Sequence, residues 1–386
     1  MKIAVIHHSL NISGGAEKLC LVAIDALKKR GHQVTLVTVE RTDWSLLQNK
    51  FGPTVMPDKE SYIVESRFSS NLASIPIASS YFFVYALLLF YSKIGGKYDL
   101  TLNTFGDAVH SFSDITYIHF PLRAALDFAQ IPAFTHTSIW REIAPLYGRT
   151  MSILDRSAPS KLLLTNSRFV QEIIRKALGR EALVVYPPVD TKIFSSKCLV
   201  TRKEDGLVVV VAGYTPKRHL EQLPRIAKYT KTAKYVVIGK NDKYGSPTMR
   251  ELKRQIHVQN VEDKITLLEN VSFNRLLELL AKAKVYLHTM PFDHFGISLV
   301  EAMASGCVPV VHQSGGPWID ILNAEQGKYG FSYLTPLEAA DHINLLIADE
   351  NLRREIAAKA SYRSKEFDTS VFTRRLAQVV EKFADG

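Results

Sequence analysis

The stretch that decides the fold is residues 2–39, KIAVIHHSLNISGGAEKLCLVAIDALKKRGHQVTLVTV. It begins with an apolar run rich in branched residues, Lys2–His8, which predicts a buried parallel strand. Gly14 and Gly15 open a helical stretch, and a second apolar strand follows at Gln33–Val39. A strand, a helix and a strand in this order predict that a doubly wound α/β sheet begins at residue 1.

The same alternation continues along the chain and restarts after a polar stretch. Two prolines stop a strand near residue 188, residues 189–206 are polar and indicate a linker, and the strand Leu207–Ala212 begins the second series. The predicted fold class is α/β, with two Rossmann-like doubly wound domains. We expect them to cover residues 1–188 and 189–369.

Composition and charge exclude several classes of protein. The 386 residues include 48 basic and 38 acidic side chains, for a net charge of +10. The excess is spread over both halves, so nucleic-acid binding is not indicated. The three cysteines, Cys20, Cys198 and Cys307, are far apart, which fits a reducing compartment rather than a disulfide framework or a structural zinc site. The chain opens directly into a strand and not into a signal peptide, so we expect a cytoplasmic protein.

One uncharged segment has the length of a membrane helix but also the features of a core helix. Phe68–Ser92 lies between Arg67 and Lys93 and is long enough to cross a bilayer. Serines and Pro76 interrupt its first half, however, and the strongly apolar part, Tyr81–Tyr91, is too short. We rank three interpretations of this segment. A buried or half-buried helix comes first, an interfacial membrane helix second, and a true membrane span last.

Candidate site residues lie in the loops that follow strands, because ligands of open α/β sheets bind outside the carboxyl ends of the strands. Gly14 and Gly15 allow close approach to the backbone and favour an anion, although a tight turn is the alternative. No G-x-G-x-x-G fingerprint is present. His119 follows a strand, but a lone histidine is more often structural. Other histidines compete for the same role: His7, His8, His110 and His136.

Two loops of the second half carry cations and glycines. Gly213, Lys217 and Arg218 follow its first strand and are typical of a phosphate clamp, with a solvated basic turn as the alternative. Gly239 follows the next strand in a similar turn.

The most informative stretch is Pro291–Gly306, PFDHFGISLVEAMASG. Asp293 and Glu301 stand eight residues apart, on either side of a glycine-bearing turn into a helix. The amides of residues 296–298 would face the ligand crevice and could hold an anion or sugar oxygens. Glu301, one turn further along, could accept two hydrogen bonds from a diol such as a ribose.

Together these stretches resemble the GT-B nucleotide-sugar glycosyltransferases of family four. The resemblance rests on Gly14–Lys18, Thr165–Ser167, Val185–Asp190 with Phe194, and the two-acid motif Asp293–Glu301, in which aspartate replaces the usual glutamate. Three further stretches are most similar to the mannosyltransferases that extend dolichol-linked oligosaccharides: Tyr117–Pro121, Asp293–Ile297 and His312–Pro317.

The resemblance implies a fold, an activity and partners. It implies two domains that face each other across a cleft, an acceptor domain at 1–188 and a donor domain at 189–369, with the C-terminal helix 370–386 packing back on the first. It implies retaining transfer of a hexose, with mannose from GDP-mannose favoured, to a lipid-linked glycan in protein glycosylation. The enzyme would be peripheral on the cytosolic membrane face, without cofactor or metal and without a nucleic-acid partner.

The resemblance also implies residue roles. Glu301 would hold the donor ribose, Asp293 would contact the hexose, and His119 would lie beside the reacting carbon. The family neutralises the leaving diphosphate with an arginine and a lysine. Here the arginine position is Gly213 and the lysine position is Arg218, so Arg218 and Lys217 would share the task. The donor-binding residues would be Gly14, Gly15, Gly213, Gly239, Phe295, Gly296, Ile297, Ser298 and Glu301.

Two other functions remain open from the sequence. A non-catalytic homologue that binds nucleotide sugars is favoured by the missing arginine. A sugar-nucleotide epimerase of the same fold would need a second set of acids around the hexose, and the sequence does not identify one.

Overall fold

The computed structural model describes most of the chain and divides it into two compact units. One unit is Met1–Pro188 together with Thr369–Gly386, and the other is Val189–Asp368. The described residues are 1–12, 14–65, 78–94, 97–122, 124, 149–150, 153–154, 156–240 and 246–385. Within these ranges no helix combines the length and the apolar character needed to cross a bilayer.

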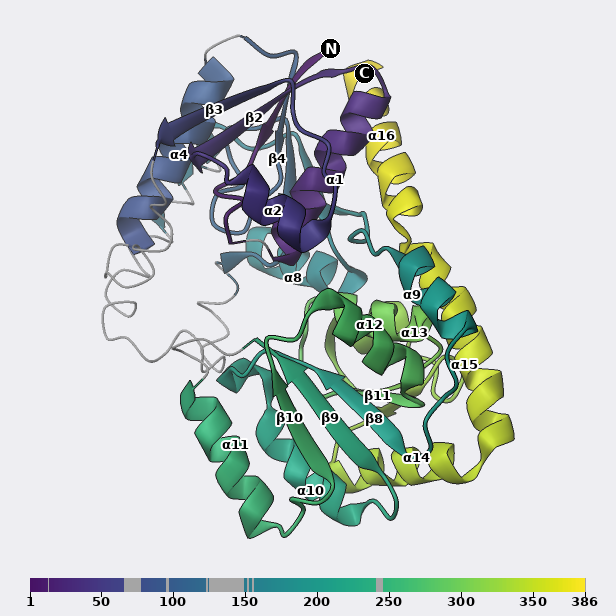
Figure 1. Ribbon diagram of the computed structural model, residues 1–386. Coiled ribbons are helices and arrows are strands. Elements are labelled where there is room, and N and C mark those ends of the chain that lie inside the picture. The colour runs from purple at the N-terminus through teal and green to yellow at the C-terminus, as the bar shows by residue number, and fades with distance from the viewer. Residues whose placement is uncertain are drawn as a thin grey trace. The chain divides into compact units, whose positions relative to one another are not determined.

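The first unit is built on a parallel sheet of seven strands in the order β3-β2-β1-β4-β5-β6-β7. Strands β2, β3 and β4 of this sheet are labelled in Figure 1. Val5 pairs with Leu36 on one side and with Leu102 on the other. The order reverses between β1 and β4, which makes their carboxyl ends the topological switch point. The strands are β1 (Lys2–Ile6), β2 (Gln33–Glu40), β3 (Lys59–Val64), β4 (Leu100–Asn103), β5 (Ile115–Ile118), β6 (Leu162–Thr165) and β7 (Leu183–Val184).

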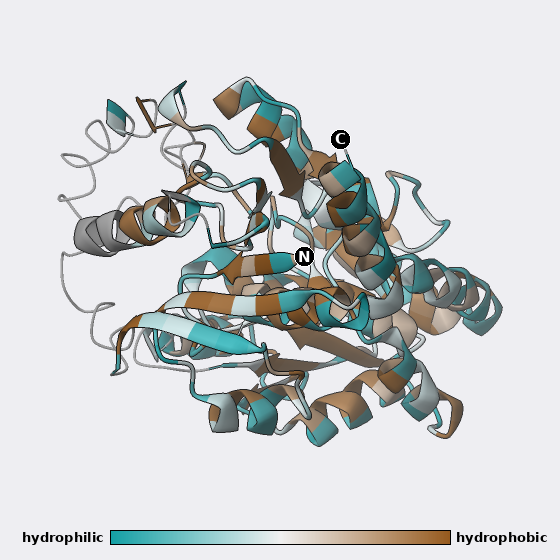
Figure 2. Ribbon diagram, turned by 90° about the horizontal axis from the view of Figure 1, so that it is seen from above, coloured by the Kyte–Doolittle hydropathy of each residue, from teal (hydrophilic) through white to brown (hydrophobic). Residues whose placement is uncertain are grey.

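Helices cover both faces of this sheet because successive strand residues point to opposite sides. Ile3 and Val5 of β1 belong to the core under α1 and α16, which pack against each other, whereas Ala4 and Ile6 belong to the core under α4. The helices mix hydrophobic and hydrophilic residues, as expected for elements with one buried face (Figure 2). They are α1 (Gly15–Lys29), α2 (Trp44–Phe51), α4 (Ala78–Ile94), α8 (Arg168–Leu178) and α16 (Thr369–Asp385).

The helix α4 contains the apolar part of the uncharged segment, whose residues 68–77 lie outside the described residues. Tyr85 and Leu89 are buried against the sheet, and the Tyr85 hydroxyl donates to Asn103 Oδ1 at 2.7 Å. On the opposite side Leu87 is 64% exposed and Tyr91 is 74% exposed. The described part is therefore a half-buried helix with an apolar outer face.

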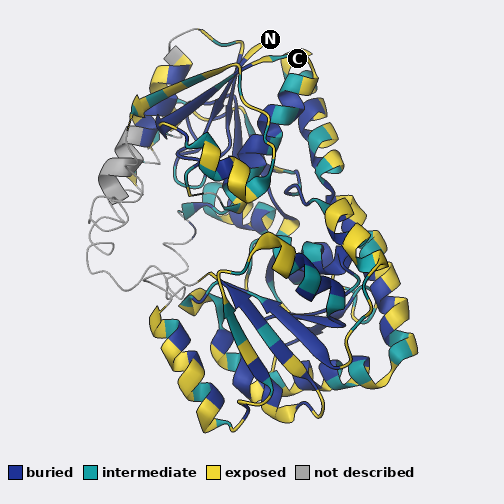
Figure 3. Ribbon diagram, viewed as in Figure 1, coloured by how far each residue is buried: buried dark blue, intermediate teal, exposed yellow. Residues whose placement is uncertain are grey.

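The second unit has a parallel sheet of six strands in the order β10-β9-β8-β11-β12-β13. The order reverses between β8 and β11, so the second switch point lies at their carboxyl ends. Strands β8, β9 and β11 are mostly buried (Figure 3). The strands are β8 (Leu207–Val211), β9 (Lys234–Gly239), β10 (Ile265–Glu269), β11 (Val285–His288), β12 (Val308–His312) and β13 (Phe331–Tyr333).

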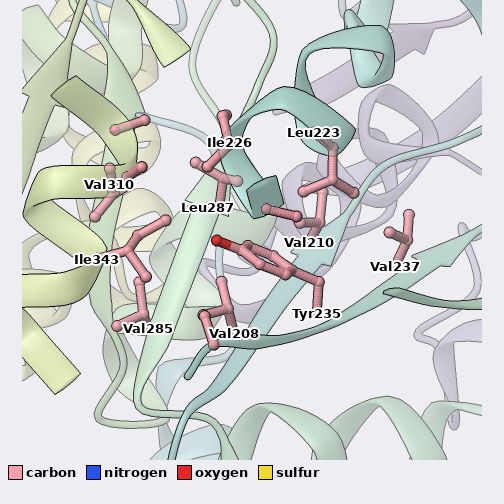
Figure 4. Packing of buried hydrophobic residues seen from close by; sticks show 14 of the residues in the cluster. Val208, Val210, Leu223, Ile226, Tyr235, Val237, Val285, Leu287, Val310 and Ile343 are labelled. Carbon is pink, nitrogen blue, oxygen red and sulfur yellow. The ribbon is translucent and has the colours of Figure 1, made fainter. Parts of the chain in front are cut away.

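Aliphatic residues fill the core of this unit. Val208, Val285 and Leu287 of the sheet pack under Ile226 and Ile343 from the covering helices (Figure 4). Two short 3₁₀ turns, Pro216–Arg218 and Leu220–Gln222, precede α10. The helices are α9 (Thr191–Leu199), α10 (Leu223–Tyr229), α11 (Ser246–Val258), α12 (Phe273–Lys282), α13 (Ile297–Ala304), α14 (Pro336–Ala348) and α15 (Glu350–Ser364).

The prediction of a linker over residues 189–206 is wrong for its first half. The helix α9 occupies Thr191–Leu199 and packs against α12 and α13. Phe194 is 1% exposed and contacts the ring of Phe273, with 5.9 Å between ring centroids. One buried aromatic residue anchors a helix whose other residues are mostly polar, so the local composition resembles a linker.

Candidate functional site

The loop after β11 holds Asp293 between a histidine and an arginine side chain. Asp293 Oδ2 lies 3.1 Å from His288 Nε2 and 3.6 Å from Arg218 Nη1. The carboxylate side chain is 15% exposed. Thr289 holds the backbone of Arg218 in place, because its hydroxyl donates to the carbonyl of Arg218 at 2.6 Å. The motif acid and the cation of the neighbouring loop are therefore brought together at the second switch point.

The electrostatics of this loop favour an ionised Asp293. Burial raises the pKa of its carboxyl, but the interactions with His288 and the positive charge of Arg218 outweigh burial and hold that pKa below its ordinary value. Burial also lowers the pKa of the Lys217 ammonium, and the nearby Arg218 charge adds to this effect. The site thus combines a carboxylate with two closely spaced cations.

The second acid lies on the helix that starts beside this loop. Gly296 precedes α13 with a φ of 100°, a left-handed conformation that glycine adopts most easily. Phe295 is 3% exposed and packs on Phe367, which fixes the start of the helix. Ser298 Oγ and the Tyr286 hydroxyl are 2.8 Å apart. Glu301 is half-buried and lies one helical turn beyond Ile297, on the same face.

The stretch after β12 supports the motif loop, a role that the sequence analysis did not assign. A Cβ atom on Gly315 would lie 2.5 Å from the carbonyl oxygen of Asp293, and one on Gly316 would lie 2.5 Å from that of His294. The amide of Gly316 donates to the Asp293 carbonyl at 2.8 Å. Ser314 Oγ accepts from the amide of Phe292 at 2.8 Å. Two adjacent glycines directly after a strand are the signal for such a close approach.

The two glycines predicted to bind the donor after β8 and β9 differ in their surroundings. A Cβ atom on Gly239 would lie 2.2 Å from the carbonyl oxygen of Ala212, so packing within the unit alone requires glycine there. A Cβ atom on Gly213 would lie 3.8 Å from the Lys240 carbonyl, which is an ordinary contact. Gly213 therefore has room for a side chain.

In the first unit His119 lies at the carboxyl end of β5. Its Nε2 donates to the Thr104 carbonyl at 3.2 Å, so the neutral ring carries its lone pair on Nδ1. Asp107 Oδ1 accepts from the amides of His119 and Phe120 at 2.6 Å and 3.0 Å. Asp107 thus orients the loop that carries His119.

The glycine loop after β1 is closed by its own helix. The amide of Gly14 donates to Glu17 Oε2 at 2.5 Å, which gives α1 a capping acid. Gly15 begins that helix, and the Glu17 carboxylate also faces His7. The remaining competing histidines are His8 and His110, both buried, and His136, which lies outside the described residues.

Sequence reasoning missed His288, Asp107 and Glu17. His288 ends β11, so the rule that selected His119 from the end of a strand also applies to it. No local pattern marks Asp107, because its partners His119 and Phe120 come from another loop. Glu17 lies three residues after Gly14, which is the spacing of a capping acid.

Comparisons with known proteins agree with the resemblance seen in the sequence. Residues 193–363 match the family model described as glycosyl transferases group 1. Two curated relatives carry the same name, GDP-Man:Man(3)GlcNAc(2)-PP-Dol alpha-1,2-mannosyltransferase. The mouse protein is 34% identical over 55% of this chain, and the Dictyostelium discoideum protein is 29% identical over 58%. The matches cover 47% of each relative, so they span about half the length of these relatives.

A solved structure establishes the fold. HepE of Anabaena in complex with UDP superposes with a TM-score of 0.73 at 18% identity, over 99% of this chain and 100% of that one. The fold is therefore GT-B, with two parallel Rossmann-like sheets, as the sequence predicts. Residues 193–363, which match the group 1 glycosyl transferase model, lie within the second unit of this fold.

Proposed function

We propose that this chain is a retaining glycosyltransferase that moves a hexose, with mannose from GDP-mannose favoured, to a lipid-linked glycan. The observation that carries the proposal is the ionised Asp293 held beside Arg218 and His288 at the start of α13. A nucleotide sugar offers hydroxyls to a carboxylate and a diphosphate to cations and helix amides, so this arrangement matches both of its parts.

Each residue of the second unit then has a task. Arg218 and Lys217 stabilise the charge that develops on the leaving diphosphate, which in such transfers is a large electrostatic contribution. Asp293 orients the hexose, and Glu301 accepts the ribose hydroxyls. In the first unit His119 would lie beside the reacting carbon.

The names of the relatives favour the sugar and the acceptor. Both relatives are named as alpha-1,2-mannosyltransferases that use GDP-Man and a dolichol-linked glycan. A lipid-linked acceptor keeps its chain in the bilayer, so we propose peripheral contact with a membrane. The exposed face of α4, with Leu87, Phe90 and Tyr91, lies close in sequence to the exposed Lys97 and suits an interface of lipid headgroups.

The test of the activity is incubation of the purified chain with radiolabelled GDP-mannose and a lipid-linked oligosaccharide extract. The expected result is label in the lipid fraction, with the α configuration of the donor kept in the product and seen by NMR of the anomeric proton. Donor binding without transfer would favour the non-catalytic homologue. An isomerised donor would favour the epimerase. UDP-glucose serves as the control donor.

The membrane contact has its own test. Leu87→Ser combined with Tyr91→Ser is expected to reduce sedimentation with anionic liposomes and to leave the thermal transition in place, since both side chains are mostly exposed. Tyr229→Ser and Tyr362→Ser, at exposed tyrosines of the second unit, are the matched controls. Unchanged sedimentation of the double variant would place the membrane contact elsewhere.

A further inference from the structure

Three buried polar side chains converge at the carboxyl end of β1 and are not used in the proposed transfer. His7 and His8 follow the strand, and Glu17 lies in the first turn of α1. Their exposed fractions are 0%, 5% and 3%. One ring nitrogen of each histidine and one carboxylate oxygen all lie within 4.8 Å of one another. Of the residues that the structure describes, no other group of three or more His, Cys, Asp or Glu is arranged in this way.

The hydrogen bonds of Thr104 decide which nitrogen of His7 carries the proton. The Thr104 hydroxyl donates to the Ile6 carbonyl at 3.1 Å. Its oxygen is therefore the acceptor for His7 Nδ1, which lies 2.9 Å away. The neutral ring then has its lone pair on Nε2, and Nε2 faces Glu17 Oε1 at 3.6 Å.

This geometry places two electron-pair donors opposite each other in a dry environment. Among the described residues His7 Nε2 has no hydrogen-bond partner, although it is buried. The side chains of His7 and Glu17 are both almost completely removed from solvent. A lone pair and a carboxylate facing each other away from water are stabilised by a cation between them.

We propose that His7, His8 and Glu17 form a site for a divalent ion of the zinc class. Imidazole nitrogens and a carboxylate oxygen are the ligands that Zn²⁺ takes when it binds three protein groups and leaves a fourth position for water or a ligand oxygen. Ligands about 2.0–2.1 Å from a tetrahedral ion lie about 3.4 Å apart. His7 Nε2 and Glu17 Oε1 are 3.6 Å apart, and the three ligand atoms together lie within 4.8 Å of one another. Thr104, bonded to the other nitrogen of His7, is the outer partner that such a ligand ordinarily has.

This inference departs from the expectation of a metal-free protein, and it does not rest on the proposed glycosyl transfer. The ion would join the end of β1 to the start of α1 and would lie near the ring of His119, because Phe105 contacts both His7 and His119. It would therefore hold the glycine loop in a fixed position relative to that histidine.

The test is a zinc titration of the full chain in competition with a chromophoric chelator, after treatment with EDTA and dialysis. We expect one equivalent of Zn²⁺ bound more tightly than by surface histidines, and a higher melting temperature with zinc. Co²⁺ should give the intense visible bands of a tetrahedral site without a thiolate charge-transfer band in the near ultraviolet.

Matched variants locate the site. His8→Ala and Glu17→Gln should abolish tight binding, and Thr104→Val should weaken it roughly 10- to 100-fold. His257→Ala is the control, since His257 Nδ1 lies 2.7 Å from Glu262 Oε1 on the exposed surface and should not matter. If the unaltered chain does not bind one equivalent of Zn²⁺ tightly, the proposal is wrong. A proton shared by His7 and Glu17 would then take the place of the metal ion. Tight binding that survives both ligand variants, or a thiolate band, overturns it as well.

Discussion

The two helices that begin at glycines, α1 in the first unit and α13 in the second, start in opposite ways. At α1 the amide of Gly14 is satisfied by Glu17 of the same helix. At α13 no side chain caps Gly296, and the first turn carries no acidic residue. A capping acid neutralises the positive end of the helix dipole, so α1 is the poorer and α13 the better place for an anionic ligand. Under the proposed function we therefore expect an anionic donor to bind at the start of α13 more readily than at the start of α1.

The largest expected effect is the loss of turnover when Arg218, the cation beside α13, is replaced. Arg218→Ala should lower kcat roughly 100- to 1000-fold, because one preformed electrostatic contact with the leaving diphosphate is lost. The measurement is initial rate at saturating GDP-mannose. Lys217→Ala is the matched control and should cost less, since Arg218 contacts both Asp293 and Met290. A larger loss for Lys217→Ala would show that the alignment of this loop is shifted by one residue.

The second expectation concerns the acid on α13. Glu301→Gln should weaken donor binding by about 1.5–3 kcal/mol for each hydrogen bond to the ribose that depends on the charge. Calorimetric titration with GDP measures it. Glu325→Gln, at an exposed glutamate paired with Lys328, is the control and should bind normally. Normal affinity in the Glu301 variant would contradict the ribose assignment.

The third expectation is a pH dependence of stability that comes from Glu17, the capping acid of α1. The pKa of Glu17 in the folded chain is about 2, below its ordinary value of 4.5. A carboxyl with a lowered pKa contributes stability above pH 4.5, and that contribution is lost as the pH falls toward 2. The loss is on the order of 2–3 kcal/mol. Glu17→Gln should flatten this part of the stability profile measured by urea unfolding, and an unchanged profile would mean that Glu17 is not the responsible group.

The smallest effect is expected from the two glycines themselves. Gly296→Ala should destabilise the protein by roughly 1–2 kcal/mol, because φ is 100° there. Gly14→Ala should cost less, since its φ of −99° suits any residue and a Cβ atom would meet only the movable end of the Glu17 side chain, at 2.9 Å. Thermal unfolding of both variants compares them. Equal costs would mean that backbone strain does not distinguish the two starts.

Most of the fold could be predicted from the sequence because its strands are continuous apolar runs between glycines and polar loops. The strand β3 was missed because its residues alternate between exposed and half-buried positions at the edge of the sheet. The strand β13 was missed because it has three residues. The helix α9 looked like a linker because a single aromatic residue, Phe194, anchors it.

The candidate site could be predicted only in part. Asp293, Gly296 and Glu301 are close in sequence, so their spacing on a turn and a helix shows that they share one loop. The cation of that loop, Arg218, lies in a different βα connection, and its pairing with Asp293 follows from the parallel sheet that aligns the ends of β8 and β11. The pairing of His288 with Asp293 likewise depends on how the end of β11 meets the loop that follows it.

By itself the sequence determined two α/β series, the start of the second series near residue 207, and the two-acid loop. Each of these features shows in the periodicity and spacing of residues that are close together in the chain. Only the tertiary structure decided which face of α4 is buried and that His7, His8 and Glu17 converge. These outcomes depend on contacts between residues far apart in the chain or on opposite faces of one element. Burial then sets their pKa values, and no local pattern records burial.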